Sequence, residues 1–134
     1  MKKIVMLAMM IIFLWAGAAF AENWIMFFKS DQFNAFFDAD RVVKKGNGYD
    51  YWTRDEYSPK NERLLGDKYL VKHNQVELRN GDWWICRVEY WSIDSQGIKH
   101  NYRDYTAKPR CQPMTWWNDE EGKTLLDGLR KYAR

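Results

Sequence analysis

The sequence is poor in the residue types that usually mark an active site, with only two histidines and two cysteines among 134 residues. It contains no Gly-x-Ser-x-Gly, no His-Glu-x-x-His and no phosphate-binding glycine loop. A histidine that acts as a general base needs a nucleophile and an orienting carboxylate, and neither His73 nor His100 lies in such a motif. We therefore predict a protein that is not an enzyme, with no catalytic residue and no cofactor, and interpret both histidines as surface or strand residues.

Metal-binding patterns are also scarce. Asp38 and Asp40 are two apart, as in a calcium loop, but such a loop needs Gly at its sixth position and Glu at its twelfth. Counted from Asp38, those positions hold Val43 and Tyr49. We predict no metal site, and a local turn in which aspartate side chains accept hydrogen bonds from backbone N–H groups.

No strong excess of one charge is present. The chain has 21 basic and 18 acidic residues, and its net charge of +3 includes Lys2 and Lys3. Without those two residues the balance is +1, and no dense basic run occurs elsewhere. A near-neutral surface argues against nucleic-acid binding and against a patch for anionic membranes.

One long apolar run occurs, at residues 4–21, and it follows two lysines. It ends in Ala19-Phe20-Ala21, which is typical of the cleavage site of a secretory signal peptide. An uncleaved membrane anchor is the alternative, because 18 uncharged residues are at the lower limit for a spanning helix. The site has no cysteine for lipidation. We expect an exported protein, periplasmic, secreted or at the cell surface, without a lipid anchor and without a membrane span after cleavage.

Both cysteines, Cys86 and Cys111, follow this segment. In an oxidising compartment an even pair is most simply a disulfide, although two free thiols or an intermolecular bridge are alternatives. The bridge would close a loop of about 26 residues, worth on the order of 3 kcal/mol in the chain-entropy model.

Residues 22–134 are predicted to form a single β-rich domain of the α+β class, mainly β. Its expected core is a single six-stranded antiparallel sheet in meander order, with one C-terminal helix packed on it. The expected strands are residues 23–28, 33–37, 49–57, 69–79, 82–91 and 98–106. Asn80-Gly81 predicts a type I′ hairpin, because both positions need φ above zero.

The other segments are predicted from their capping residues and prolines. Asn118 is expected to cap the C-terminal helix. The residues expected to pack on the sheet are Leu125, Leu126, Leu129, Tyr132 and Ala133. We predict a polar loop for Ser58–Arg63 and an irregular segment for Pro109–Pro113.

Arg87 and Glu89 decide the predicted orientation of the strand after the Asn80-Gly81 turn, since both need solvent. The alternation then assigns Trp84, Cys86, Val88 and Tyr90 to the core, and Trp83, Ile85 and Trp91 to the outer face. A bulge would swap the two sets beyond it.

Aromatic residues are abundant, with eight Trp, eight Tyr and seven Phe. Their simplest role is to fill a small core. The alternative is that Trp83, Trp91 and Trp52 form an exposed aromatic surface, because Trp and Tyr are enriched at protein-binding sites.

Several features of the chain after residue 21 together resemble those of a known family. They comprise Trp24, Phe37-Asp38-Ala39-Asp40-Arg41-Val42, the strand around Trp52, the hairpin leading into Cys86, the turn at Gly97, Trp116 and Leu125-Leu126. In these features the sequence resembles the surface-adhesin protein E family of Gram-negative bacteria. That resemblance implies a small exported antiparallel sheet with a C-terminal helix, of which some members bind host extracellular-matrix and plasma proteins.

The expected function is a non-catalytic, adhesin-like binding module whose partner is a host matrix or cell-envelope protein. Two alternatives stay open. One is a periplasmic enzyme or inhibitor that acts on cell-wall glycans, with aromatic rings stacking on sugars. The other is a structural envelope protein whose interaction is self-association.

Overall fold

The computed structural model describes residues 22–134, so the predicted signal peptide lies outside the described part of the chain. One antiparallel sheet holds all eight strands. The strands are β1 (Trp24–Lys29), β2 (Phe33–Asp38), β3 (Val43–Lys45), β4 (Gly48–Tyr57), β5 (Asp67–Arg79), β6 (Asp82–Asp94), β7 (Lys99–Asp104) and β8 (Arg110–Pro113). The helices are η1 (Ala39–Arg41), α2 (Pro59–Leu65) and α3 (Glu120–Tyr132).

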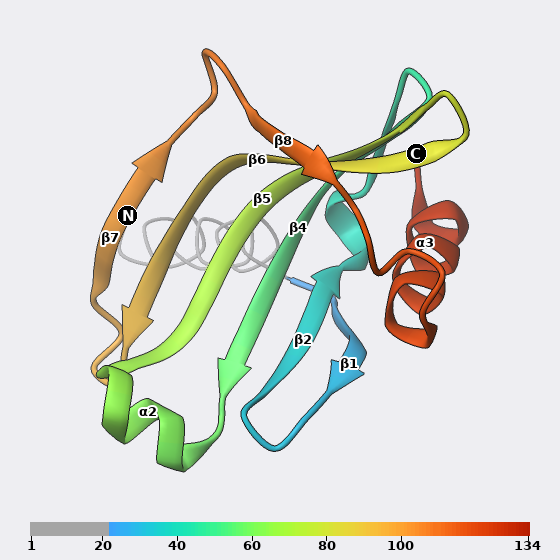
Figure 1. The fold of residues 1–134 in the computed structure, drawn as a ribbon. Helices are drawn as coiled ribbons and strands as arrows, with labels where there is room; N and C mark the ends of the chain where they lie inside the picture. Colours follow the sequence, from blue (N-terminus) through green and yellow to red (C-terminus); the bar gives the residue numbers. More distant parts are fainter. Residues whose placement is uncertain (1–21) are drawn as a thin grey trace, which may run out of the picture.

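Six of these strands follow one another as a meander in the order β1-β2-β4-β5-β6-β7 (Figure 1). The predicted antiparallel meander with a C-terminal helix is therefore confirmed. The structure adds two short strands at positions that the meander leaves open. β3 pairs with the start of β4, which β2 does not reach, and β8 pairs with the first half of β6, while β7 pairs with the second half.

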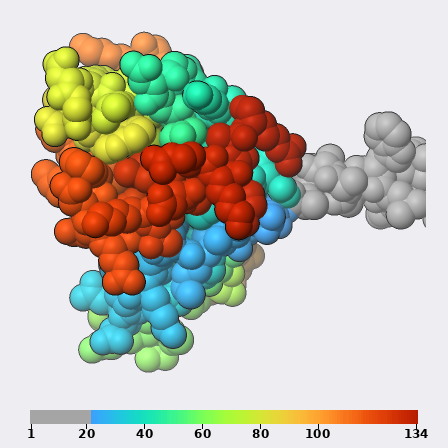
Figure 2. Space-filling model, turned by 90° about the vertical axis from the view of Figure 1, so that its right-hand side faces the viewer, coloured from blue at the N-terminus to red at the C-terminus, as the bar shows by residue number. Residues whose placement is uncertain are grey.

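Helix α3 packs on one face of the sheet, which we call the helix face. Its leucines Leu125, Leu126 and Leu129 are buried together with Tyr51 of β4 and Val76 of β5. This confirms the predicted apolar stripe of the helix. Figure 2 shows the segment from β8 to α3, in orange-red and red, lying between the yellow tip of the β5–β6 hairpin and the blue β1–β2 hairpin.

The β5–β6 hairpin has the predicted turn, with φ of 50° at Asn80 and 85° at Gly81. Its predicted face assignment is wrong at the start of β6. Trp83 and Ile85 pack against the core under α3, whereas Cys86 is paired with Gln75 on the opposite face. Cys86 and Val88 are nevertheless buried, as predicted. Trp84 lies on that opposite face too, because side chains alternate along a strand.

Beyond a β-bulge in β6, the predicted faces agree with the structure. His73 pairs with Glu89 and Asn74 with Arg87, so Val88 is the extra residue, and beyond it Tyr90 shares the helix face with Ile85. Arg87 is on the helix face and still exposed. The premise that its charge marks the outer face failed because α3 covers only part of this side of the sheet.

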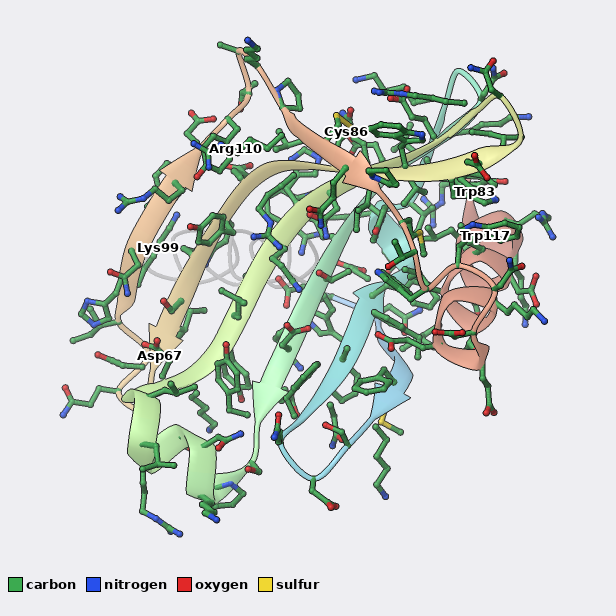
Figure 3. The ribbon with its side chains drawn as sticks, viewed as in Figure 1. Asp67, Trp83, Cys86, Lys99, Arg110 and Trp117 are labelled. Carbon is green, nitrogen blue, oxygen red and sulfur yellow. A yellow bond between two sulfur atoms is a disulfide. The ribbon has the colours of Figure 1, made fainter. Side chains whose placement is uncertain are left out.

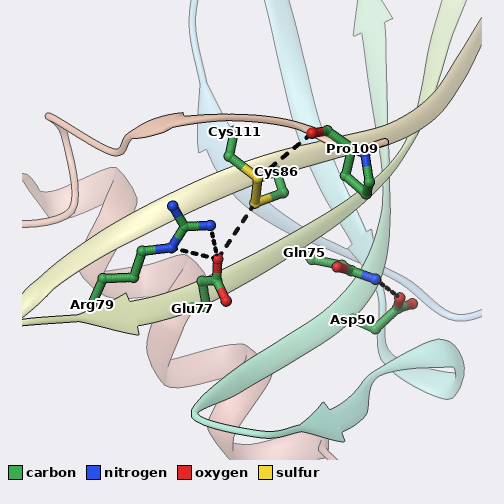
Figure 4. Close-up of a disulfide and its surroundings, with 7 residues drawn as sticks. All are labelled: Asp50, Gln75, Glu77, Arg79, Cys86, Pro109 and Cys111. Atoms are coloured by element: carbon green, nitrogen blue, oxygen red, sulfur yellow. Dashed lines mark hydrogen bonds and ion pairs between the residues drawn. A yellow bond between two sulfur atoms is a disulfide. The ribbon is translucent and has the colours of Figure 1, made fainter. Parts of the chain in front are cut away.

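The disulfide Cys86–Cys111 is present, with an S–S distance of 2.07 Å (Figure 4). The two cysteines are directly opposite each other in the β6–β8 pair. The bridge therefore fastens β8, an edge strand, to the middle of the longest hairpin. The sequence predicted an irregular segment here, but prolines are tolerated at a sheet edge.

Helix α2 replaces the predicted polar loop. Ser58 caps it by accepting a hydrogen bond from the Asn61 N–H, Pro59 occupies the first turn, and Gly66 ends it with φ of 76°. A serine before a proline and a glycine after the last turn are known helix boundaries, so the signal was readable. Within residues 22–134, no helix is long and apolar enough to cross a membrane.

Candidate functional site

The face of the sheet opposite α3 carries a cluster of aromatic and cationic side chains, and we call it the aromatic face. Trp52 points to it because its neighbours Tyr51 and Thr53 are buried on the helix face. Trp52 pairs with His73 across β4 and β5, and Val71 pairs with Trp91 across β5 and β6. Helix α2 lies at the end of the sheet, where β4 leads into β5 (Figure 1).

The centre of the aromatic face is a group of stacked rings. The His73 ring lies parallel to Trp52, with centroids 4.5 Å apart and an interplanar angle of 7°. Trp91 is 5.5 Å from Trp52 on one side and 6.0 Å from Tyr102 of β7 on the other. Offset and tilted contacts at these distances contribute about 0.5–1.5 kcal/mol each beyond burial. The rings therefore hold one another in fixed positions across four strands.

Lys99 completes this group from the edge strand β7, where Figure 3 labels it. Its Nζ is 3.8 Å from the ring centroid of Trp91 and 4.5 Å from that of Tyr102. Residues three apart in a regular strand point to opposite faces. Asn101, with φ of 55° at an irregularity in the β6–β7 register, allows Lys99 and Tyr102 to share one face.

Two arginines extend the aromatic face toward β1. The Cζ atom of Arg41 is 4.7 Å from the Trp52 ring centroid, and Asp38, which is buried, fixes this guanidinium with a 2.6 Å ion pair. Arg54 lies 4.7 Å from the ring of Trp24. Asp38 also accepts a hydrogen bond from the backbone N–H of Asp40, which confirms the predicted local turn.

A row of hydrogen-bonded and ion-paired side chains crosses the same face. His73 Nε2 is 2.6 Å from Asp50 Oδ1, and its Nδ1 is 3.5 Å from Glu89 Oε1. Gln75 donates to the second oxygen of Asp50, and Tyr102 donates to the second oxygen of Glu89 at 2.6 Å. The carboxylates therefore connect β4, β5, β6 and β7 through side chains alone.

These contacts shift two pKa values. Burial acts to raise the pKa of Asp50, but hydrogen bonds from His73 and Gln75 outweigh burial and hold it below the ordinary 3.8. The hydrogen bond from Tyr102 to Glu89 raises the pKa of the phenol to about 12, so the proton stays on Tyr102.

The geometry of His73 does not suit acid–base catalysis. A general base must present a free nitrogen to its substrate. Both ring nitrogens of His73 face carboxylates, Nδ1 is closed to solvent, and one ring face is covered by Trp52. His100, the other candidate, is exposed on β7 and contacts Asp94 at 2.7 Å. In this arrangement His73 holds the side chains around it on the aromatic face in place.

The structure brings together two of the three residues of the predicted binding surface. Trp52 and Trp91 are in contact, whereas Trp83 lies on the helix face beside α3, as Figure 3 shows for Trp83 and Trp117. The sequence did not point to Arg41 or Lys99. Their signal is weak, because a surface lysine or arginine has no periodicity of its own and the irregularity at Asn101 is not readable in advance.

The sulfur and acidic groups do not form a metal site. Within residues 22–134 the one cluster of potential ligands is Glu77, Cys86 and Cys111, and its two cysteines are in the disulfide. Figure 4 shows that Arg79 pairs with Glu77 beside the bridge. A disulfide offers no thiolate, so this cluster lacks the ligands that zinc requires.

Comparison with known proteins found no match to a family model, to a curated protein or to a solved structure. The resemblance to surface-adhesin protein E therefore stays a prediction from the sequence.

Proposed function

We propose that the chain is an exported, non-catalytic binding module that holds a protein partner on its aromatic face. The observation that carries the proposal is the fixed group of Trp52, Trp91 and Tyr102 with Lys99 held against two of the rings. Tryptophan and tyrosine side chains are among the residues that contribute most to the energy of protein interfaces. Rings that are already ordered lose little entropy on binding.

The charges on this face favour a partner that carries acidic groups near apolar ones. Arg41 and Arg54 are neutralised by carboxylates, at 2.6 Å and 2.7 Å respectively. Among residues 22–134, the amine of Lys99 has no carboxylate within ion-pair distance. It remains available to a carboxylate of the partner, which would then also cover Trp91.

The test is a binding assay with residues 22–134 immobilised, against purified extracellular-matrix proteins and against cell-envelope extract. We expect saturable binding that survives high salt and falls at least about ten-fold for Trp91→Ala, the loss typical of an interface hot spot. Lys99→Gln should reduce affinity less and weaken its salt dependence.

Trp84→Ala is the matched control. Trp84 lies on the same side of the sheet but opposite Glu77 rather than Val71 of β5, about 20 Å from Trp91 at the usual rise per strand residue. Equal losses for Trp84→Ala and Trp91→Ala, or no partner from either source, would count against the proposal.

The same assay separates the alternatives. Retention on cell-wall glycans, with turnover that Asp50→Asn or Glu89→Gln removes, would favour an enzyme. Binding confined to a second copy of the chain, seen by sedimentation, would favour a structural component.

A further inference from the structure

The helix face is hollow beside α3. Two cavities of about 230 Å³ and 190 Å³ lie next to each other and share Asn74 and Ile85 as lining residues. The larger cavity is otherwise lined by Arg87, Tyr90, Tyr105, Arg110 and Gln112. Its wall depends on the bulge in β6, because the carbonyl of Val88 accepts a 2.6 Å hydrogen bond from the N–H of Tyr105.

Two arginines stand directly opposite each other at this cavity. Arg87 of β6 pairs with Arg110 at the start of β8, and both line the cavity. Figure 3 labels Arg110. Like charges in this position repel each other. Among residues 22–134, neither guanidinium has a carboxylate within ion-pair distance. The pair therefore lacks a counter-charge from the protein.

Tyrosine rings hold the two guanidinium groups in place. The Cζ atom of Arg110 is 4.4 Å from the ring centroid of Tyr105, and that of Arg87 is 5.1 Å from the ring centroid of Tyr90. The two rings are 6.3 Å apart. Stacking on aromatic rings leaves the N–H groups of a guanidinium free to bind an anion in its plane.

The floor of the hollow has unsatisfied polar atoms. Asn74 is in register with Arg87 on one side and with Tyr51 on the other. The Oδ1 of Asn74 and the Oγ1 of Thr53 are buried without a hydrogen-bond partner. The buried hydroxyl of Tyr51 lies beside the amide of Asn74. Buried polar groups in native proteins are nearly always paired with protein, water or ligand.

We propose that this hollow is a binding site for a small organic anion, whose carboxylate or phosphate group is held by Arg87 and Arg110. The planar guanidinium is suited to two parallel hydrogen bonds with either group. Hydroxyls on the body of the ligand would reach Gln112 and Asn74. The cavity is smaller than the roughly 300–1,000 Å³ of sites for drug-sized molecules, so a single acidic ring or a short chain fits.

This site is separate from the aromatic face, since the two lie on opposite sides of the sheet. The larger cavity contains neither Trp52, nor Trp91, nor Lys99. A small anion and a protein partner could therefore occupy the molecule together, and either proposal can fail without the other.

The test is a calorimetric titration of residues 22–134, in a buffer without oxyanions, with glucuronate, inorganic phosphate and glucose. Glucuronate carries a carboxylate on a hydroxylated ring, phosphate tests the anion alone, and glucose is the neutral control. We expect glucuronate or phosphate to bind with 1:1 stoichiometry and glucose not to bind. Preference between the two anions identifies the acidic group that the site takes, and failure of both to bind overturns the proposal.

Variants locate the binding. Arg110→Gln and, separately, Arg87→Gln should weaken anion binding about ten-fold or more, as expected for a lost charge-assisted hydrogen bond. Arg63→Gln is the matched control, because Arg63 is exposed on α2 at the other end of the sheet. Equal weakening by Arg63→Gln would show unspecific charge attraction and overturn the proposal.

Thermal unfolding distinguishes a ligand site from a structural role. Without anion, Arg110→Gln should melt at or above the temperature of the wild type, because the substitution removes repulsion. At the same anion concentration, the wild type should gain more in melting temperature than Arg110→Gln, because it binds the anion more tightly. A lower melting temperature of Arg110→Gln without anion would mean that Arg110 supports the fold, and would count against the proposal.

Discussion

Both faces of the sheet contain buried polar atoms without a hydrogen-bond partner, and the two faces differ in what surrounds these atoms. On the aromatic face, unpaired nitrogens lie against charges or rings: His73 Nδ1 is 3.5 Å from Glu89, and Arg54 lies between Trp24 and Tyr69. On the helix face, Tyr51 and its neighbours border open volume. Asn34 Oδ1, on the aromatic face, is also without a hydrogen-bond partner. The difference between the faces is therefore in what surrounds the unpaired atoms, because the helix face leaves volume beside them that a ligand can occupy.

The largest expected effect concerns the covered part of the helix face. Leu129 is fully buried under α3, so Leu129→Ala removes its packing and leaves a cavity. We expect a loss of about 2–5 kcal/mol in the free energy of unfolding, measured by urea denaturation. Affinity for a partner of the aromatic face should stay unchanged under conditions where the variant is folded.

Leu64→Ala is the control for that substitution. Leu64 also lies on a helix, α2, but it is 73% exposed. Leu64→Ala should change the free energy of unfolding by no more than about 0.5 kcal/mol. If the two leucine variants were equally stable, α3 would not be anchored by its buried stripe.

The disulfide lies on the side of the sheet opposite α3, but the strand that it fastens, β8, also lines the cavity on the helix face. Cys86→Ala combined with Cys111→Ala should cost about 3 kcal/mol, mainly through the freedom regained by the unfolded chain. Because β8 carries Arg110 and Gln112, anion affinity should fall as well, whereas binding through Trp91 should persist.

Calorimetry and partner binding on the same preparation check this prediction. A reductant should destabilise the wild type and leave the double variant unaffected. Loss of partner binding in parallel with anion binding would mean that the two faces are not independent.

Gly122 tests how closely α3 approaches the segment before it. A Cβ atom at this position would collide with the backbone of Trp116 and Trp117, which cannot move aside as a side chain can. Although Ala is favoured over Gly by about 1 kcal/mol in an open helix, Gly122→Ala should lose about 1–3 kcal/mol. Lys123→Ala, on the exposed side of α3, should be near neutral in the same thermal unfolding series. A gain in stability for Gly122→Ala would contradict the observed contact.

The sequence was sufficient for the elements whose signals are local. Asn80-Gly81 set the central hairpin, and the leucine stripe set the packing of α3, because turn geometry and helical periodicity need no knowledge of distant residues. The same local rules predict α2 from Ser58, Pro59 and Gly66, although the polar composition of this segment is typical of a loop.

The candidate sites were only partly predictable, because they depend on register. A single extra residue, Val88, reverses which side chains face α3 in the second half of β6, and no residue type marks a bulge of this kind. Trp52 was placed correctly because β4 alternates regularly, whereas Trp91 was placed correctly because the bulge offset the wrong face assignment at the start of β6. The opposition of Arg87 and Arg110 arises from pairing between β6 and β8, so it is invisible until the chain is folded.

The smallest expected effect is an opposite response of the two faces to pH. The pKa of Asp50, on the aromatic face, is below its ordinary 3.8 in the folded protein. Its contribution to stability is therefore present above that ordinary value and is lost as pH falls through the folded pKa. Asp50→Asn should flatten the decline in unfolding free energy below about pH 4.

Glu121, beside the cavity on the helix face, behaves in the reverse sense. Burial, with a smaller contribution from Asp55, raises its pKa above the ordinary 4.5. Its contribution is thus fully present below that value and is lost as pH rises through the folded pKa. Glu121→Gln should flatten the decline in unfolding free energy above about pH 4.5. Urea denaturation across pH 3–7 measures it. If both substitutions changed the slope of unfolding free energy against pH on the same side of about pH 4.5, the two carboxylates would have the same environment. That result would contradict their positions on opposite faces of the sheet.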